Sequence, residues 1–177
     1  SLEILINCAF AESTSFDFEN DTAEGTQFVL GQTPTSITVV NFTLETVDDP
    51  ALAHSGTKAL VLVPGTDGMI VFERGVQNLQ FYAADTQSGG RIELRDKNLI
   101  ILANSGVVEG LPTNISPGTN PLLQSFVAFN RNTMVTSDLN FSNGIKEIKI
   151  INPGGAVALD DLGFSYVDGP PNNTVFE

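Results

Sequence analysis

Apolar and polar residues alternate along most of this chain with a period of two, which places successive side chains on opposite faces of a β-strand. The alternation is clearest over 36–44, 91–95 and 145–151. Clusters of Gly, Pro, Asn and Asp separate the alternating runs, as at 64–68 and 152–155. No stretch carries helical spacing of apolar residues over more than about two turns. The pattern therefore predicts a chain built from short strands and turns.

The turn signals divide the chain into strands and hairpins. We expect 91–95 and 99–103 to form one hairpin, and 145–151 to turn and return over 156–167. Short strands with frequent polar connections favour antiparallel pairing, and about ten of them predict an all-β jelly-roll β-sandwich of two antiparallel sheets. Further strands are expected over 36–44, 58–63, 69–73, 76–84 and 125–130, with a long loop over 110–121.

The length of 177 residues and the hydrophobic content of 41% are typical of one globular domain. We expect this domain to occupy 1–167, followed by a C-terminal tail or linker at 168–177 that is rich in Gly, Pro and Asn. The one cysteine, Cys8, leaves no disulfide within the chain and no zinc site built from cysteines.

The charge balance narrows the possible partners. The chain has 21 acidic and 8 basic residues, for a net charge of -13. Such a surplus of negative charge repels phosphate backbones and anionic membrane surfaces, so we expect neither nucleic acid nor insertion into a membrane. The apolar stretches also fall far short of the roughly 20 residues that span a bilayer.

One carboxylate stands out by its position in the last expected strand. Leu162, Phe164 and Tyr166 share one face by alternation, and their apolar character directs that face to the core. Asp160 shares this face, whereas Asp161 falls on the opposite one. A carboxylate directed inward is costly unless it is paired or bound to a metal. Calcium, which takes six to eight oxygen ligands, is one such partner, and a turn cap or an ion pair with Lys or Arg is the alternative.

Three local motifs occur together in a known order. They are Phe16-Asp17-Phe18-Glu19 near the start, 54–60 with its Ser-Gly step, and 158–164 with its Asp-Asp-Leu step. This order resembles calcium-containing jelly-roll domains of the galactose-binding-like type. Examples are the family 4 and family 22 carbohydrate-binding modules and, more distantly, MAM-type adhesion domains.

The resemblance implies a structural calcium ion. Its carboxylate ligands would be Glu19 and Asp160, with Asp17 in reserve, and the segment from Ser55 to Lys58 would supply backbone carbonyls. Such an ion would tie the N-terminal segment to the last strand and stabilise the fold by linkage. The resemblance also implies a location outside the cell, either secreted or at the cell surface.

The expected glycan contacts rest on few residues, because the chain has no Trp, 12 Phe and 2 Tyr. Most Phe occupy core positions by alternation, whereas Tyr82 lies opposite Phe81 and is a candidate for stacking on a sugar. Arg91 and Arg95 flank Glu93 on one face of a strand. They could bind sugar hydroxyls or a uronate carboxylate, or belong to a solvated strand face with cross-strand salt bridges.

These observations favour a non-catalytic extracellular binding module whose ligand is a polysaccharide or glycan. A cell-surface adhesion or matrix-assembly domain that binds protein is the alternative. A small polysaccharide-degrading enzyme is a more distant one, because no specific pair of carboxylates stands out among the 21 acids. The sequence also has no Gly-x-Ser-x-Gly elbow, no phosphate-binding glycine loop and no His-Glu-x-x-His motif.

Overall fold

The computed structural model is all β in the part of the chain that it describes, which comprises residues 13–47, 53, 55–85, 91–96, 98, 101–104, 133–136, 144–151 and 156–167. The strands are β1 (Ser13–Phe16), β2 (Gln27–Leu30), β3 (Ile37–Val40), β4 (Phe42–Thr46), β5 (Lys58–Leu62), β6 (Gly68–Asp85), β7 (Arg91–Arg95), β8 (Ile101–Asn104), β9 (Thr133–Thr136), β10 (Ile145–Ile151) and β11 (Val157–Tyr166). Within these ranges no helix is long and apolar enough to cross a membrane.

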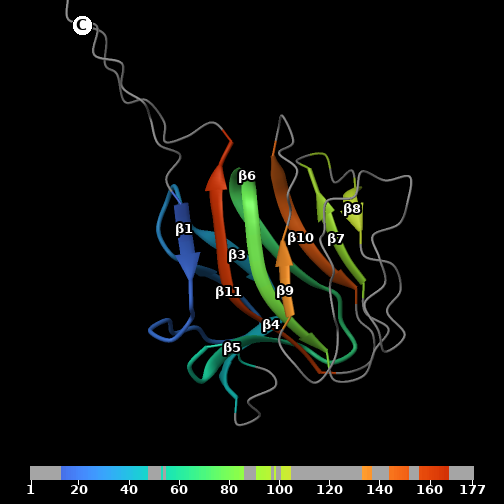
Figure 1. Ribbon diagram of the computed structural model, residues 1–177. Helices are drawn as coiled ribbons and strands as arrows, with labels where there is room; N and C mark the ends of the chain where they lie inside the picture. The colour runs from blue at the N-terminus through green and yellow to red at the C-terminus, as the bar shows by residue number, and fades with distance from the viewer. Residues whose placement is uncertain are drawn as a thin grey trace, which may run out of the picture.

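The strands form two antiparallel layers that face each other across one core (Figure 1). Sheet I contains β2, β3, the first half of β6, β10, β7 and β8. Sheet II contains β9, the second half of β6, β11 and β1, with β5 and β4 continuing beside the start of β11. The predicted all-β jelly-roll sandwich of two antiparallel sheets is confirmed.

Strand β6 belongs to both sheets. Its residues 68–72 pair with β3 and β10, its residues 77–85 pair with β11, and Val76 between them pairs with the start of β10 and the end of β11. The crossing lies at 73–75, where the Lys146 ammonium donates to the backbone carbonyls of Phe72 and Glu73. Two consecutive carbonyls are thus held by one cation, which fixes the bend between the two layers.

The core-facing side of β6 changes as the strand moves from one layer to the other. Ile70 and Phe72 face the core in sheet I, whereas Leu79, Phe81 and Ala83 face it in sheet II, so the buried positions change from even to odd numbers. The change falls at Asn78, whose φ of 51° is in the left-handed region. One residue outside the extended conformation lets the same strand present a buried face to each side of the sandwich.

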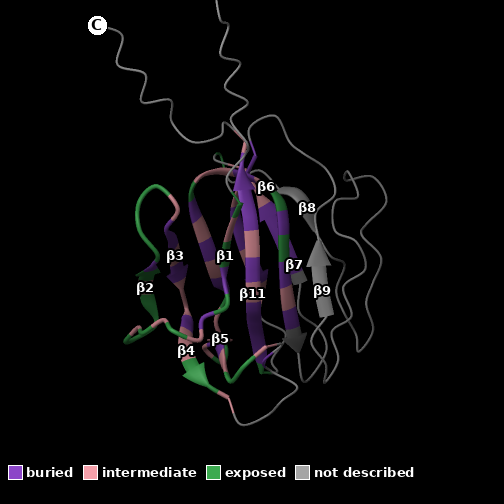
Figure 2. Cartoon of the chain, turned by 60° about the vertical axis from the view of Figure 1, so that its left-hand side comes forward, coloured by how far each residue is buried: buried purple, intermediate pink, exposed green. Residues whose placement is uncertain are grey.

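The core is one contiguous apolar cluster contributed by both sheets. Phe72 of sheet I meets Phe164 of sheet II edge to face, with 4.8 Å between ring centroids. Figure 2 shows buried residues along the length of β11. The expectation that Phe72, Phe81 and Phe164 are core residues is confirmed, as is the inward face of β11 with Leu162, Phe164 and Tyr166.

The structure divides or joins three of the expected strands differently from the prediction. The run 36–44 is two strands rather than one, because Asn41 has a φ of 61° and its side-chain amide donates to the carbonyl of Asp67 at 2.9 Å. The two strands expected over 69–73 and 76–84 are the single strand β6. Alternation shows which residues share a face, but it does not show where a strand continues through a bend.

The expected hairpin of 145–151 with 156–167 was also wrong, because β10 and β11 pair with opposite halves of β6 and lie in different sheets. The hairpin of β7 with β8 is confirmed by their antiparallel pairing. The expected loop at 110–121, the expected strand at 125–130 and the tail at 168–177 lie outside the described residues.

Gly144, just before β10, gives a direct test of the packing beside the β6 crossing. It has a φ of +72°, and a Cβ there would lie 2.5 Å from the carbonyl carbon of Gly75. Gly144→Ala should therefore combine a left-handed backbone cost of about 1–2 kcal/mol with an overlap cost of about 1–3 kcal/mol. Gly65→Ala is the matched control, because Gly65 has a φ of +78° and nothing within 4 Å of a Cβ.

Urea unfolding of the two variants measures the difference. We expect Gly144→Ala to lower the free energy of unfolding clearly more than Gly65→Ala, which should lose only the left-handed term of about 1–2 kcal/mol. Equal losses in the two variants would show that the close approach of Gly144 to Gly75 does not contribute to stability.

Candidate ligand-binding faces and the 55–58 turn

The turn at 55–58 receives the carboxylate of Glu19. The backbone N–H groups of Thr57 and Lys58 both donate to Glu19 Oε1, at 2.9 and 2.7 Å. A Cβ at Gly56 would overlap the Glu19 carboxyl group, so a glycine is needed where the carboxylate lies against the turn. The predicted association of Glu19 with this turn is therefore present.

The same turn receives Asp160 from β11. Asp160 is completely buried, but it does not share the core face of Leu162 as the sequence predicted. It pairs with the outward-facing Tyr82, while its neighbour Leu159 is in the core, because the left-handed Asp161 shifts the alternation before Leu162. The Ser55 N–H donates to Asp160 Oδ2 at 3.0 Å, and the Ser55 hydroxyl donates to Asp161 Oδ1 at 2.8 Å. The Asp161 N–H also donates to Asp160 Oδ1 at 2.8 Å. The turn thus joins the segment after β1 to the last strand.

The other predicted members of this site have local roles. Asp17 is exposed, and its Oδ1 accepts the backbone N–H of Glu19 at 3.1 Å. The Lys58 ammonium donates to the carbonyl of Asp21 at 2.9 Å. Burial, and then the nearby charge of Asp17, raise the pKa of the Asp21 carboxyl, and Lys58 opposes this.

The turn binds the two carboxylates with its backbone N–H groups, whereas the sequence predicted that it would contribute backbone carbonyls. One of those carbonyls, that of Thr57, accepts the N–H of Val47 at 2.7 Å. In the described part of the chain, no three His, Cys, Asp or Glu side chains converge in a way that could hold a metal ion.

A second set of charged groups lies on the outward side of sheet I. Arg95 of β7 donates from Nε at 3.0 Å and from Nη2 at 2.5 Å to one oxygen of Glu93. Its Nη1 lies 3.9 Å from Oε1 of Glu147 on β10. Glu93 and Glu147 are only 1% and 5% exposed, so the expectation of a solvated strand face was wrong here. The expected salt bridge is present, but it is largely buried.

The outward residues of sheet I form two rows across four strands. One row runs from Thr38 through Val71 and Glu147 to Arg95, and the next runs from Val40 through Met69 and Lys149 to Glu93. Strands β3 and β6 contribute the apolar half of this surface, and β10 and β7 contribute the charged half. We call these eight residues the sheet I face.

The apolar half of the sheet I face continues onto β2. Val29 pairs with Thr38 and is 60% exposed, which makes it the one large apolar side chain that is fully exposed among the residues described. In the charged half, the side chain of Arg95 is 18% exposed and that of Lys149 is 23% exposed, and Lys149 Nζ lies 3.8 Å from Asp67 Oδ2. Arg95 and Lys149 are therefore the charged groups that reach the surface.

Tyr82 lies on the other sheet. It faces outward from the second half of β6, is half-buried, and pairs across the strands with Asp160. Arg91 pairs with Ile151 at the end of β7, and its side chain lies outside what the structure describes. The three ligand-binding residues expected from the sequence thus do not form one site, because Tyr82 and Arg95 belong to opposite faces of the sandwich.

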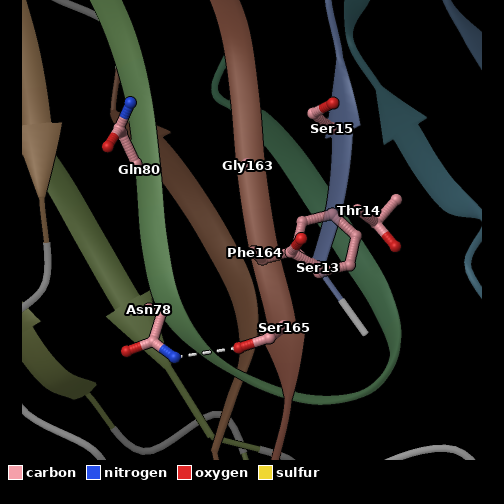
Figure 3. Close-up of a pocket in the computed structure, with 8 residues that line it drawn as sticks. All are labelled: Ser13, Thr14, Ser15, Asn78, Gln80, Gly163, Phe164 and Ser165. Carbon is pink, nitrogen blue, oxygen red and sulfur yellow. Dashed lines mark hydrogen bonds between the residues drawn. The ribbon is translucent and has the colours of Figure 1, made fainter. Parts of the chain in front are cut away.

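The outward side of sheet II contains a shallow hollow with a volume of about 330 Å³ (Figure 3). Strands β1, β11 and β6 line it side by side. Its lining residues are Ser13, Thr14, Ser15, Asn78, Gln80, Gly163, Phe164 and Ser165. Sequence reasoning missed this hollow. The available signal was the outward phase of polar residues on three strands, but the adjacency of those strands could not be known from the sequence.

No model of a known protein family matches the chain, and no curated protein matches it. Solved structures that resemble it are carbohydrate-binding modules. A family 29 module in complex with mannohexaose is 9% identical with a TM-score of 0.48, and the match covers 90% of this chain and 96% of that one. The C-terminal family 6 module of a marine laminarinase from Zobellia galactanivorans is 12% identical with a TM-score of 0.43, and the match covers 87% and 99%.

A family 6 module from Clostridium stercorarium in complex with cellobiose is 14% identical with a TM-score of 0.41, and the match covers 86% of this chain and 93% of that one. The neighbours are thus carbohydrate-binding modules, of families 29 and 6, where the sequence motifs resembled families 4 and 22. At these identities and TM-scores, the likeness does not assign a function to this chain.

Proposed function

We propose that this chain is a non-catalytic carbohydrate-binding module, secreted or at the cell surface, and that it binds a polysaccharide through the sheet I face. The observation that carries the proposal is the position of Arg95. Its guanidinium is held by the buried carboxylate of Glu93, on the same side of the sheet as the apolar residues of β6, with β10 between them.

A sugar ring has apolar C–H faces and a rim of hydroxyl groups, so a complementary surface needs both kinds of contact. Met69 and Val71 supply apolar surface in the centre of the sheet I face, and Arg95 and Lys149 supply charged donors next to it. Because Glu93 already orients Arg95, binding costs little additional side-chain entropy. Charge-assisted hydrogen bonds to hydroxyls are also stronger than neutral ones.

The alternatives have weaker support. An adhesion surface for a protein partner would need a contiguous apolar patch of several hundred Å², whereas Val29 stands alone as an exposed large apolar residue in the described ranges. A hydrolase would need two carboxylates across an accessible cleft. Glu93 and Glu147 are nearly buried, and Glu93 is committed to Arg95.

The proposal predicts that Arg95→Lys weakens glycan binding by about tenfold, because the loss of a fixed planar donor set costs roughly 1–2 kcal/mol. Lysine keeps the positive charge beside the two buried carboxylates, so the variant should remain folded. Calorimetric titration with soluble neutral and uronate-containing polysaccharides measures the effect. Lys149→Gln should weaken binding as well.

Glu45→Gln is the control, because Glu45 is an exposed charged residue on β4, outside the sheet I face. Its affinity should equal that of the unmodified protein. If Arg95→Lys and Lys149→Gln both bind every responding polysaccharide with unchanged affinity, the sheet I face is not the binding site.

We also propose that the module binds a structural calcium ion at the 55–58 turn. Two carboxylates from distant parts of the chain, Glu19 and Asp160, lie against this one turn, and the Ser55 hydroxyl is beside them. Such oxygen donors suit a hard cation, with backbone carbonyls completing its coordination. Both N–H groups that reach Glu19 donate to Oε1, so Oε2 is the oxygen that would face the ion.

The calcium proposal predicts a higher melting temperature with added calcium than with excess EDTA. An ion present at about 100 times its Kd stabilises the folded state by about 2.7 kcal/mol, which corresponds to a rise of roughly 5–10 °C for a domain of this size. Thermal unfolding followed by circular dichroism measures the shift. Asp160→Ala should lose most of the rise.

Asp67→Asn is the matched control, because Asp67 lies beyond the other end of β5 from the turn, beside Lys149. It should keep the whole calcium-dependent rise. Equal melting temperatures of the unmodified protein in calcium and in EDTA would contradict the calcium proposal. Hydrogen bonds alone would then connect the 55–58 turn to Glu19 and Asp160.

A further inference from the structure

The hollow on sheet II is built from a local defect in the pairing of β11 with β6. Asp160 pairs with Tyr82 and Ser165 pairs with Gln77 in one register, but the intervening pair of Gly163 with Gln80 is shifted by one residue. The pairing is therefore interrupted on both sides of Gly163 and then restored.

Each interruption contains a residue in the left-handed region. Asp161 supplies the extra residue in β11 with a φ of 47°, and Asn78 supplies it in β6 with a φ of 51°. Two opposed bulges cost stability and leave the overall register unchanged, so sheet pairing alone does not explain them. What they change is the surface between them, because they interrupt the pairing on both sides of Gly163 and leave Asn78 exposed.

The floor of the hollow is open at Gly163. A Cβ built there would have the Thr14 carbonyl oxygen, at 3.9 Å, as its nearest neighbour. The glycine is thus not needed to avoid a clash within the protein. Its effect is to leave the backbone of β11 accessible, as is found where a ligand approaches a strand closely.

The walls of the hollow are polar and uncharged. Ser13 and Ser15 stand on the β1 side, and Asn78 and Gln80 stand on the β6 side, all four of them exposed (Figure 3). Asn78 is oriented by its side-chain amide, which donates to the hydroxyl of Ser165 at 2.9 Å. The hollow therefore offers hydroxyl groups on the β1 side and amide groups on the β6 side, with the Asn78 amide already fixed.

We infer that this hollow is a second carbohydrate site, distinct from the sheet I face, and that it takes a neutral saccharide. Neutral hydroxyl and amide groups pair well with sugar hydroxyls. They offer no counter-charge to a uronate, a phosphate or a metal ion, and the net charge of -13 further opposes anions. Tyr82 follows Gln80 on the outward side of β6 and extends the surface with an aromatic ring.

The two sites face away from each other, because β6 contributes Met69 and Val71 to one sheet and Asn78 and Gln80 to the other. One domain would thus hold two separate glycan chains at once, and could bridge them. Bridging increases the strength of attachment to a polysaccharide without any new contact.

Calorimetric titration of the full chain with cellohexaose and with mannohexaose tests the inference. The variants are Gly163→Val, which fills the hollow, and Gln80→Ala, which removes an exposed amide and leaves the core intact. We expect two sites per molecule in the unmodified protein for at least one hexasaccharide. Gly163→Val should leave one site, and Gln80→Ala should weaken the second site by about three- to tenfold.

Thr46→Val is the control for a β-branched apolar residue at an exposed strand position away from the hollow, and it should retain both sites. If Arg95→Lys loses binding while Gly163→Val and Gln80→Ala do not change it, the hollow is not a site and the sheet I face stands alone. If Gly163→Val abolishes binding while Arg95→Lys does not change it, the hollow is confirmed and the sheet I proposal fails. No binding of either hexasaccharide by the unmodified protein overturns the inference.

Discussion

The passage of β6 from one sheet to the other is the constraint on which this structure depends. The Lys146 ammonium holds two successive carbonyls at the bend, and Gly144 packs against the backbone of Gly75 beside it. Hydrogen bonds from Ser36, and to a lesser extent from Thr33, hold the pKa of the Glu73 carboxyl below its ordinary value of 4.5 at the same place. Because one strand serves both layers, it contributes outward residues to both faces: Met69 and Val71 to one, and Asn78 and Gln80 to the other.

The two ends of β11 connect this framework to the rest of the chain. Near its start, Asp160 is fixed to the 55–58 turn, which also receives Glu19 from the segment that follows β1. Farther along, Gly163 and Ser165 lie between β1 and β6 in the hollow of sheet II. Two of the strands that line the hollow, β1 and β11, are therefore connected through one turn. A buried carboxylate that serves only stability is costly, so its role here is to fix the relative position of distant segments.

The sequence allowed the fold class and the core face of Leu162, Phe164 and Tyr166 to be predicted, because both follow from alternation within strands. Asp160 is buried, but the bulge at Asp161 places it on the other face of β11 from Leu162, and alternation alone could not show that bulge. The sequence also brought Glu19, Ser55 and Asp160 together through their motifs. Alternation does not show which strands become neighbours, and so the separation of β10 from β11 and the continuity of β6 were missed. The hollow was missed for a related reason, since Asn78 and Asp161 adopt left-handed conformations that Asn and Asp tolerate but do not require.

The burial of Glu93 and Glu147 was beyond sequence reasoning as well. Charged residues on the outward face of a strand are normally expected to contact solvent. Only the assembled sheet shows that Arg95 lies between two nearly buried carboxylates, those of Glu93 and Glu147. This arrangement distinguishes the sheet I face from an ordinary charged strand surface. In the proposed function, this fixed guanidinium takes the place of the tryptophan that the chain lacks.

The most direct measurement is NMR of the protein labelled with ¹³C at the methionine methyl groups, during titration with a polysaccharide fragment that calorimetry has shown to bind. The chain has 2 methionines, and Met69 lies in the centre of the sheet I face, so its signal reports on that face. The account predicts that the Met69 signal shifts and saturates with the calorimetric affinity. A Met69 signal that stays unchanged at saturating ligand would contradict it.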